Sequence, residues 1–150
     1  MKVVSQPEML KWEKNCRFNN NYPLQMGESR NCSFVHNALN GGFGIKSRDF
    51  YEKCMVFEKD GAIYKYSASV NNSEEAKAAP DKDTIRGVGY FSMIKAWRDP
   101  ADQKVHYMAQ MQSDFKLEIP AMILGQILPN SAKGWMKEAQ KHYTKNHKNL

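Results

Sequence analysis

One Asp60-Gly61 pair between two β-rich runs constrains the fold of this chain more than any other feature. The runs cover 49–57 and 62–70, and only the segment 58–61 separates them. An Asp-Gly pair in this position is a strong hairpin signal, because glycine adopts positive φ angles without a steric penalty. The sequence therefore predicts an antiparallel hairpin near the middle of the chain.

Further strands are expected on both sides of this hairpin. The segment 33–39 predicts a strand that ends at a turn with two glycines, at 40–42. The segments 84–97 and 104–114 predict two more strands, joined at 98–102 as a second hairpin. Together these segments predict a sheet that is mostly antiparallel.

The other segments are less regular. The segment 7–15 suits a short helix, and 17–30 is expected to be mostly loop with one short strand. The segment 71–83 is expected to be a polar loop, since it is too long for a tight turn. No internal repeat interrupts this pattern.

The strand expected over 84–97 carries large apolar groups on both faces, so each face must be covered. Strand alternation places one set of its residues on a shared face: Arg86, Val88, Tyr90, Ser92 and Ile94. The cover comes from the segment after Pro120, where apolar residues from Met122 to Tyr143 recur at helical spacing, and Met122, Ile123 and Ile127 are expected to be buried. Pro129 is expected to kink or interrupt this helix. The fold class predicted is α+β, a curved antiparallel sheet that grips one long C-terminal helix.

Length and composition limit the class of protein that this chain can be. The chain has 150 residues, of which 41% are hydrophobic and 25% charged, which predicts one folded domain over 1–150. The longest uncharged apolar run, 119–128, is about half of the ~20 residues that a membrane-spanning helix needs. No signal-peptide pattern precedes Pro7, so an intracellular and cytoplasmic location is expected. The three cysteines lack metal-ligand spacing and are expected to be reduced thiols in or near the core.

The net charge of +6 is concentrated at the end of the chain, since the segment 133–150 contains five lysines and only one glutamate. Because no basic stripe interleaved with aromatic residues accompanies it, a nucleic-acid partner is disfavoured. Four of the lysines recur every four residues and form one stripe: Lys133, Lys137, Lys141 and Lys145. The stripe is either a solvated helix face or a surface for transient attraction to an anionic membrane.

Catalytic signatures are missing from the sequence. It has no phosphate-cradling glycine-rich loop and no His-Glu-x-x-His pattern, so no enzymatic activity, cofactor or metal is predicted. Cys54 with His106 forms a nucleophile and base only if the fold brings them together. Asp49 and Glu52 are candidate paired carboxylates, but solvated charges explain them equally well.

Several segments, in chain order, resemble the START family, the lipid-transfer domains related to steroidogenic acute regulatory protein. They are 10–15, 45–50, 69–86 and 112–120 followed by the closing helix, so the resemblance covers about 10–143. It implies a helix-grip fold in which a tunnel between sheet and C-terminal helix holds one lipid, either a phospholipid or a sterol. It also implies a set of lipid-binding residues: Phe50, Arg86, Val88, Tyr90, Ser92, Gln112, Met122, Ile123 and Ile127.

The resemblance leaves the ligand open. In the branch that binds phosphatidylcholine, aromatic residues cage the choline group, and Phe50 and Tyr90 stand at two such positions. The third falls near Asn37, which is not aromatic. In the sterol-binding branch a buried acid and an arginine face the tunnel. The matching positions are near Val35 and Cys54, so that pair is absent from this sequence.

The sequence departs from the family pattern in one respect. Family members carry an N-terminal helix and first strands before the element that matches Trp12, and no segment of this sequence is expected to supply them. The resulting sheet is expected to have about six strands, with an exposed edge and an open tunnel wall. Either the chain is a fragment or a short form, or a second polypeptide completes the wall. The alternative function is therefore a START-like module that acts as a protein-interaction or scaffold subunit without lipid transfer.

Overall fold

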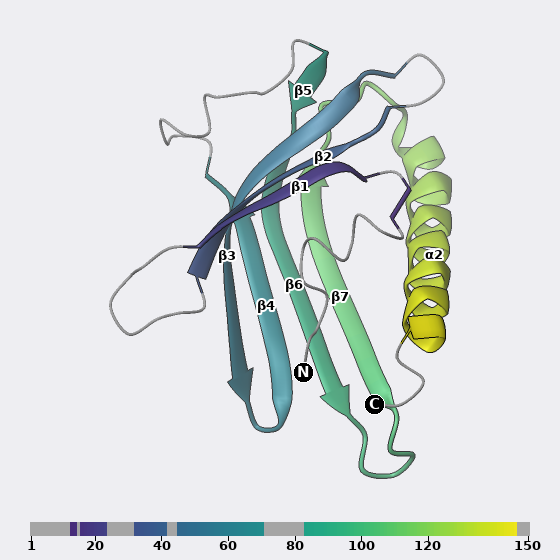
Figure 1. The fold of residues 1–150 in the computed structure, drawn as a ribbon. Coiled ribbons are helices and arrows are strands. Elements are labelled where there is room, and N and C mark those ends of the chain that lie inside the picture. The colour runs from purple at the N-terminus through teal and green to yellow at the C-terminus, as the bar shows by residue number, and fades with distance from the viewer. Residues whose placement is uncertain (1–12, 15, 24–31, 42–44, 71–82, 147–150) are drawn as a thin grey trace.

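The computed structural model describes residues 13–14, 16–23, 32–41, 45–70 and 83–146. Its strands are β1 (Cys16–Pro23), β2 (Cys32–Leu39), β3 (Ser47–Lys59), β4 (Ala62–Ser69), β5 (Thr84–Arg86), β6 (Val88–Arg98) and β7 (Val105–Asp114). The helix α2 (Ala121–Asn146) follows them. The strands form one curved sheet, and α2 lies along one side of it (Figure 1). The predicted α+β architecture is confirmed.

The strand order is β1-β2-β3-β4-β6-β7, and each of these neighbours is antiparallel. The predicted central hairpin is β3 and β4, with Asp60 and Gly61 at φ of 51° and 70° in its turn. Both angles lie in the left-handed region that this type of hairpin turn requires. The predicted second hairpin is β6 and β7.

The strand expected over 84–97 is divided at Gly87, because β5 leaves the hairpin and pairs parallel with the start of β3. The Gly87 N–H donates to the Asp49 carbonyl oxygen at 2.9 Å. A Cβ at Gly87 would lie 2.4 Å from Cε1 of Phe50, so the backbone passes over the Phe50 ring where only glycine fits.

A β-bulge overturns the predicted shared face of β6. The pairing of β6 with β7 shifts register between Gly89 and Phe91, which leaves Tyr90 as an extra residue. Before the bulge Val88 pairs with Asp114, and after it Ser92 pairs with Met111. Because Asp114 and Met111 differ by an odd step along β7, Val88 and Ser92 lie on opposite faces of the sheet.

The position of α2 distinguishes the two faces of the sheet. Tyr107 on β7 contacts Trp135 of α2, with ring centroids 6.0 Å apart. We call the face that carries Tyr107 the inner face and the opposite one the outer face. By the strand register, the inner face also carries Phe50, Glu52, Cys54, Ser67, Ser92, Ile94 and Met111.

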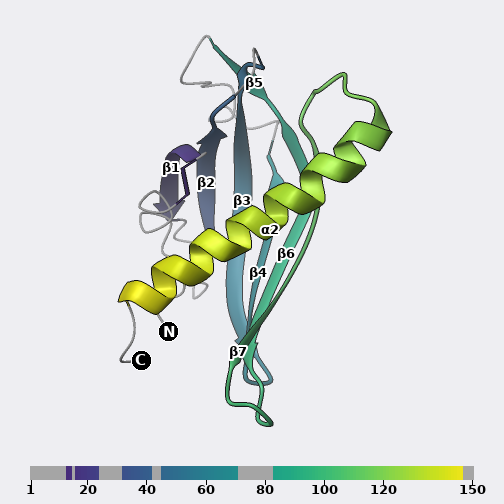
Figure 2. The same ribbon diagram turned by 90° about the vertical axis from the view of Figure 1, so that its right-hand side faces the viewer.

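The helix α2 crosses the inner face diagonally (Figure 2) and continues through Pro129. The interruption expected at Pro129 therefore does not occur. The residues of α2 that expose least surface are Leu124, Trp135, Ala139 and His142. They recur on one stripe, since Leu124 and Trp135 are about three helical turns apart.

The expected burial of the first apolar residues of α2 is wrong. Met122 is 76% exposed, Ile123 43% and Ile127 47%. Apolar residues nearly surround this half of the helix, so their spacing alone does not say which side faces the sheet. The side that meets the sheet is the stripe of Leu124 and Trp135.

The buried core lies where β2 and β3 pair, with Val35, Ala38, Tyr51 and Cys54 among its members. All three cysteines are free thiols, and Cys16 and Cys54 are buried, as predicted.

The segment expected to be mostly loop, 17–30, begins with β1, a strand longer than the sequence suggested. The helix expected over 7–15 and the loop over 71–83 lie almost wholly outside the described residues. Among the described residues, no helix is long and apolar enough to cross a lipid bilayer.

Candidate functional site

The inner face is the side of the curved sheet that α2 crosses, and we call this side the trough (Figure 2). A polar band crosses it. Cross-strand pairing sets Glu52 beside Ser69, and Ser67 between Cys54 and Ser92. The next residue along the latter row is Met111 on β7. Three strands therefore place a carboxyl group and several hydroxyl groups together on a face that the sequence predicted to be apolar.

Glu52 is the carboxylate of this polar band, and it is partly buried. The Ser67 hydroxyl donates to its Oε2 at 3.2 Å. Burial raises the pKa of Glu52, while the Ser67 hydrogen bond and the charge of Lys65 oppose the rise. A Cβ at Gly89 would lie 2.4 Å from Oε1 of Glu52, so glycine at this position leaves room for the carboxyl group.

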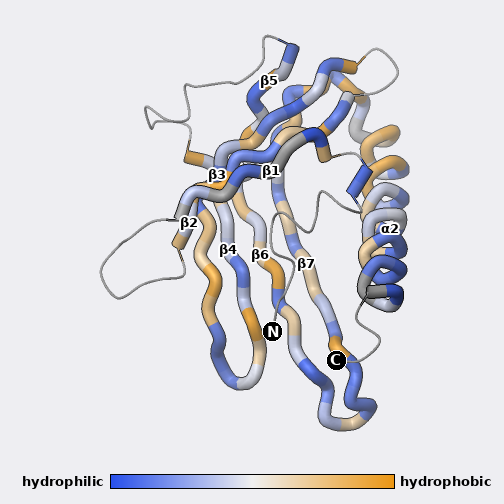
Figure 3. Tube along the Cα trace, in the orientation of Figure 1, coloured by the Kyte–Doolittle hydropathy of each residue, from blue (hydrophilic) through white to orange (hydrophobic). Residues whose placement is uncertain are grey.

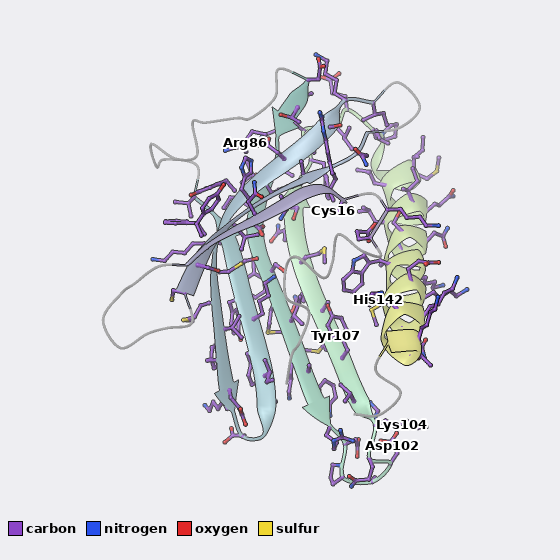
Figure 4. The ribbon with its side chains drawn as sticks, in the orientation of Figure 1. Cys16, Arg86, Asp102, Lys104, Tyr107 and His142 are labelled. Carbon is purple, nitrogen blue, oxygen red and sulfur yellow. The ribbon has the colours of Figure 1, made fainter. Side chains whose placement is uncertain are left out.

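Apolar groups flank the polar band on both sides. At one end Phe50 packs edge-on against Phe115, with ring centroids 5.3 Å apart. Tyr107, which Figure 4 labels on β7, meets Trp135 of α2 with ring centroids 6.0 Å apart. Burial raises the pKa of Tyr107 to about 12. A separate hollow of about 240 Å³ lies at the hairpin ends, where residues of both faces border it, among them Ile63 and Trp97.

The trough is open along β7. Among the described residues β7 pairs with β6 alone and forms an edge of the sheet. Met111 points into the trough from this edge and is 66% exposed. The helix therefore contacts the sheet at Trp135 but leaves apolar surface of the inner face uncovered.

The structure gathers only part of the predicted lipid-binding set. Phe50 and Ser92 lie on the inner face, whereas register places Val88 and Gln112 on the outer face. Tyr90 lies in the bulge with 57% of its surface exposed. No ring contact joins Tyr90 to Phe50 among the described residues. The three apolar residues predicted from α2 are between 43% and 76% exposed.

Arg86, the remaining member of the set, lies on the outer face in a buried ion cluster. Its Nη2 donates to Asp49 Oδ2 at 2.7 Å, and Nε2 of His36 lies 2.8 Å from the same oxygen. Burial alone would raise the pKa of Asp49, but the hydrogen bonds from Arg86 and His36 outweigh it and hold this pKa below its ordinary value. The cluster joins β2, β3 and β5. Two of the segments that resemble START domains contain Asp49 and Arg86.

The candidate catalytic pairs do not form. Cys54 is on the inner face and burial raises the pKa of its thiol, which disfavours the reactive thiolate. His106 is on the outer face, stacked on Trp97 with ring centroids 5.5 Å apart. Asp49 and Glu52 are separated by an odd step along β3, so the sheet lies between their carboxyl groups.

A partly exposed cluster at the hairpin of β6 and β7 brings Asp99, Asp102 and His106 together, with one ligand-type atom of each within 4.8 Å of the others. The backbone N–H of Lys104 donates to Asp102 at 2.9 Å, and His106 lies 3.2 Å from the same carboxylate. The Lys104 hydrogen bond is the main reason why the pKa of Asp102 is lowered. Hydrogen bonds within the turn account for this arrangement, which Figure 4 shows at the end of the hairpin.

Three solved structures resemble the chain over most of its length. Human STARD10 matches with a TM-score of 0.75 and 16% identity, covering 99% of this chain and 59% of that one. Human StAR-related lipid transfer protein 5 matches with a TM-score of 0.77 and 17% identity, covering 97% and 67%. The lipid transfer and protein localization domain of human StarD13 (DLC2) matches at 0.62 and 18%, covering 75% and 54%.

These likenesses define the fold. The curved sheet with its C-terminal helix is the helix-grip fold of START domains, so the predicted resemblance is confirmed at this level. The chain spans between about half and two thirds of the lengths of the three structures. No protein-family profile matches the sequence, and no curated protein matches it either.

Proposed function

We propose that this chain binds one lipid in the trough between the inner face and α2, and that it transfers this lipid between membranes. The proposal draws support from the helix-grip fold and from two structural neighbours that are described as lipid transfer proteins. The observation that carries it is the geometry of α2. The helix meets the sheet through Trp135 and Tyr107, while Met111 on the same face stays 66% exposed.

Burial of the lipid supplies the affinity. An apolar chain laid along Met111, Tyr107 and Ile94 would leave water, and each methylene group so removed contributes about 0.8 kcal/mol. Such a site needs no catalytic residue, which agrees with the separation of Cys54 from His106. Phe50 and Ser92 are the predicted lipid-binding residues that we retain in the site.

The outer side of α2 suits a transient contact with an anionic membrane. The first half of the helix is hydrophobic and its second half hydrophilic (Figure 3). The second half exposes the predicted lysine stripe on the side away from the sheet: Lys133, Lys137, Lys141 and Lys145. Each lysine near an anionic surface contributes about 1 kcal/mol. The exposed Met122 and Ile123 add apolar surface that can enter the headgroup region.

A scaffold role is the second candidate, and the edge position of β7, which pairs only with β6 among the described strands, favours it. A strand from another polypeptide could pair there and close the trough, because an unpaired edge presents a row of hydrogen-bonding groups. Size-exclusion chromatography with light scattering tests this role. A folded monomer that carries lipid would contradict it.

Native mass spectrometry of the purified chain, followed by lipid extraction, tests the first proposal. We expect one lipid per chain and transfer of that lipid from donor to acceptor vesicles. A variant with the four stripe lysines changed to glutamine should keep the bound lipid but transfer it more slowly to vesicles that contain phosphatidylserine. Protein that is folded, yet free of lipid and unable to extract any from vesicles, would contradict the proposal.

A further inference from the structure

We propose that the outer face of the sheet is a membrane-docking surface that binds an anionic bilayer. This inference goes beyond the proposed function, because it concerns the side of the sheet opposite the trough (Figure 2) and does not require a bound lipid. It starts from an arrangement that the proposed lipid site does not use. Aromatic rings and lysines from β3, β4 and β6 lie together on the outer face, and large apolar side chains beside them are exposed.

Five aromatic side chains form a ladder across the outer face: Phe57, Tyr64, Tyr66, Phe91 and Trp97. Phe57 of β3 stacks with both tyrosines of β4, with ring centroids 5.3 and 5.7 Å apart. Tyr66 continues the ladder to Phe91 of β6, at 5.9 Å. The rings of tyrosine and tryptophan, which are apolar with a polar end, suit the boundary between lipid headgroups and acyl chains.

Large apolar side chains remain exposed on and beside this ladder. Met55 is 44% exposed, Phe91 36% and Met108 42%, and each belongs to a different strand. Cross-strand ring pairs stabilise a sheet by themselves, but that role does not require exposed methionines next to the rings. Exposed apolar groups that gather on one face mark a surface that binds a membrane or another protein.

The charged side chains on this part of the outer face are all lysines. They are Lys53 and Lys59 on β3 and Lys95 on β6. Glu58 is the only acidic residue in the described segments 53–59, 62–68, 91–97 and 106–112, and the register places it on the inner face. Further acidic residues lie beyond these segments, in the hairpin turns: Asp60, Asp99 and Asp102. A face with apolar groups and charge of one sign matches an anionic bilayer, where apolar burial and the attraction of lysines add.

The ring geometry favours a bilayer over a single-stranded nucleic acid, whose bases bind by stacking on free ring faces. The rings of Phe57 and Tyr66 lie 4° from parallel, and Nζ of Lys95 lies 4.9 Å from the ring centroid of Trp97. These faces are therefore partly occupied, whereas lipid can contact ring edges and methionines. A second copy of this chain is disfavoured, because the lysines of two identical faces would repel each other.

The two membrane-facing surfaces then lie on opposite sides of the molecule. The lysine stripe lies on the side of α2 away from the sheet, and the outer face lies beyond the sheet (Figure 1). The chain can therefore hold two bilayers at once, a consequence that rests on the proposed contact of α2 with a membrane. Such bridging would keep donor and acceptor membranes close during lipid transfer.

Cosedimentation with vesicles tests the outer face separately from α2. The protein used is the variant in which the four stripe lysines are glutamine, so that α2 no longer attracts the membrane by charge. We expect it to bind vesicles of phosphatidylcholine with phosphatidylserine, and to bind pure phosphatidylcholine vesicles much less. Adding Lys53→Gln and Lys59→Gln should weaken this binding about thirtyfold, since each lysine at an anionic surface contributes about fivefold.

The matched control adds Lys46→Gln and Lys104→Gln instead, which change two exposed lysines outside the outer-face segments. Both pairs remove the same charge, so a difference between them reports the position of the lysines and not the net charge. Met55→Ser removes an exposed apolar group and should also weaken binding. Urea unfolding with an unchanged midpoint confirms that each variant is folded.

Light scattering tests the bridging. The unchanged chain should cluster vesicles that contain phosphatidylserine, and clustering should be lost when either the stripe or the pair Lys53 and Lys59 is changed. Clustering that survives the change of Lys53 and Lys59 would overturn the inference.

The binding assay separates the inference from the proposed function. No vesicle binding by the stripe variant, or equal weakening by both lysine pairs, would overturn the inference but leave lipid binding in the trough intact. Tighter binding of a single-stranded oligonucleotide at the same salt concentration, lost on changing Lys53 and Lys59, would also overturn it. Vesicle binding as predicted, by protein that never takes up a lipid, would contradict the proposed function alone.

Discussion

Asp49→Asn is expected to destabilise the protein strongly, because Asp49 is the centre of the buried ion cluster that joins three strands. Its side chain exposes 0% of its surface, and Oδ2 is bound by both Arg86 and His36. Breaking a buried ion pair on one side costs about 3–5 kcal/mol, because the remaining charge stays buried without compensation. Because 21% of the Arg86 side chain is exposed, water can partly solvate its charge. The free energy of unfolding should therefore fall by about 3 kcal/mol, the lower end of this range.

Urea unfolding at neutral pH measures this loss as a lower midpoint with an unchanged m-value. Asp114→Asn is the control, since Asp114 pairs with Lys116 at the surface and its replacement should not move the midpoint. If both variants unfold at the wild-type urea concentration, the outer-face cluster does not hold β2, β3 and β5 together.

Three further predictions concern the same strands and the helix. Because the folded pKa of Asp49 is below its unfolded value near 3.9, its stabilising effect should be present above about pH 4 and be lost as the pH falls further, measured by urea unfolding at several pH values. For Glu52 the sign is opposite, so Glu52→Gln should raise the free energy of unfolding at pH 7 but not at pH 4; equal changes at both would refute this. Gly87→Ala should lower the free energy of unfolding by about 1–3 kcal/mol, because the new Cβ would clash with the Phe50 ring. Gly134→Ala, which has open space around it, should raise the free energy of unfolding by up to about 1 kcal/mol, and thermal unfolding measures both changes.

The local elements could be predicted from the sequence because their signals are local. Asp60 and Gly61 specify a turn whichever strands they join, and the apolar spacing after Pro120 specifies a helix. The break at Gly87 and the bulge at Tyr90 could not be predicted, because each depends on the partner strand. A bulge changes the face of every residue beyond it, so strand alternation misassigned part of the site.

The polar band on the inner face was missed for a related reason. Glu52 alone suggests a solvated charge, and Ser67 alone is a common strand residue. Only the register of β3 with β4 brings them to the same face. The side of α2 that faces the sheet could not be predicted from the sequence either, because apolar residues nearly surround the first half of the helix. Resemblance to START domains supplied Phe50 and Ser92, but not the helix residues that face the sheet.

Quenching of Trp135 fluorescence by a brominated diacylglycerol tests most directly whether a lipid occupies the trough. Trp135 faces the inner face, whereas Trp97 lies on the outer face and is the internal control. Two variants that retain Trp135 or Trp97 as the single tryptophan would be loaded with the lipid and separated from vesicles. Strong quenching of Trp135 with little change at Trp97 is the predicted result. Equal quenching of both, or quenching of Trp97 alone, would contradict a lipid held between the sheet and α2.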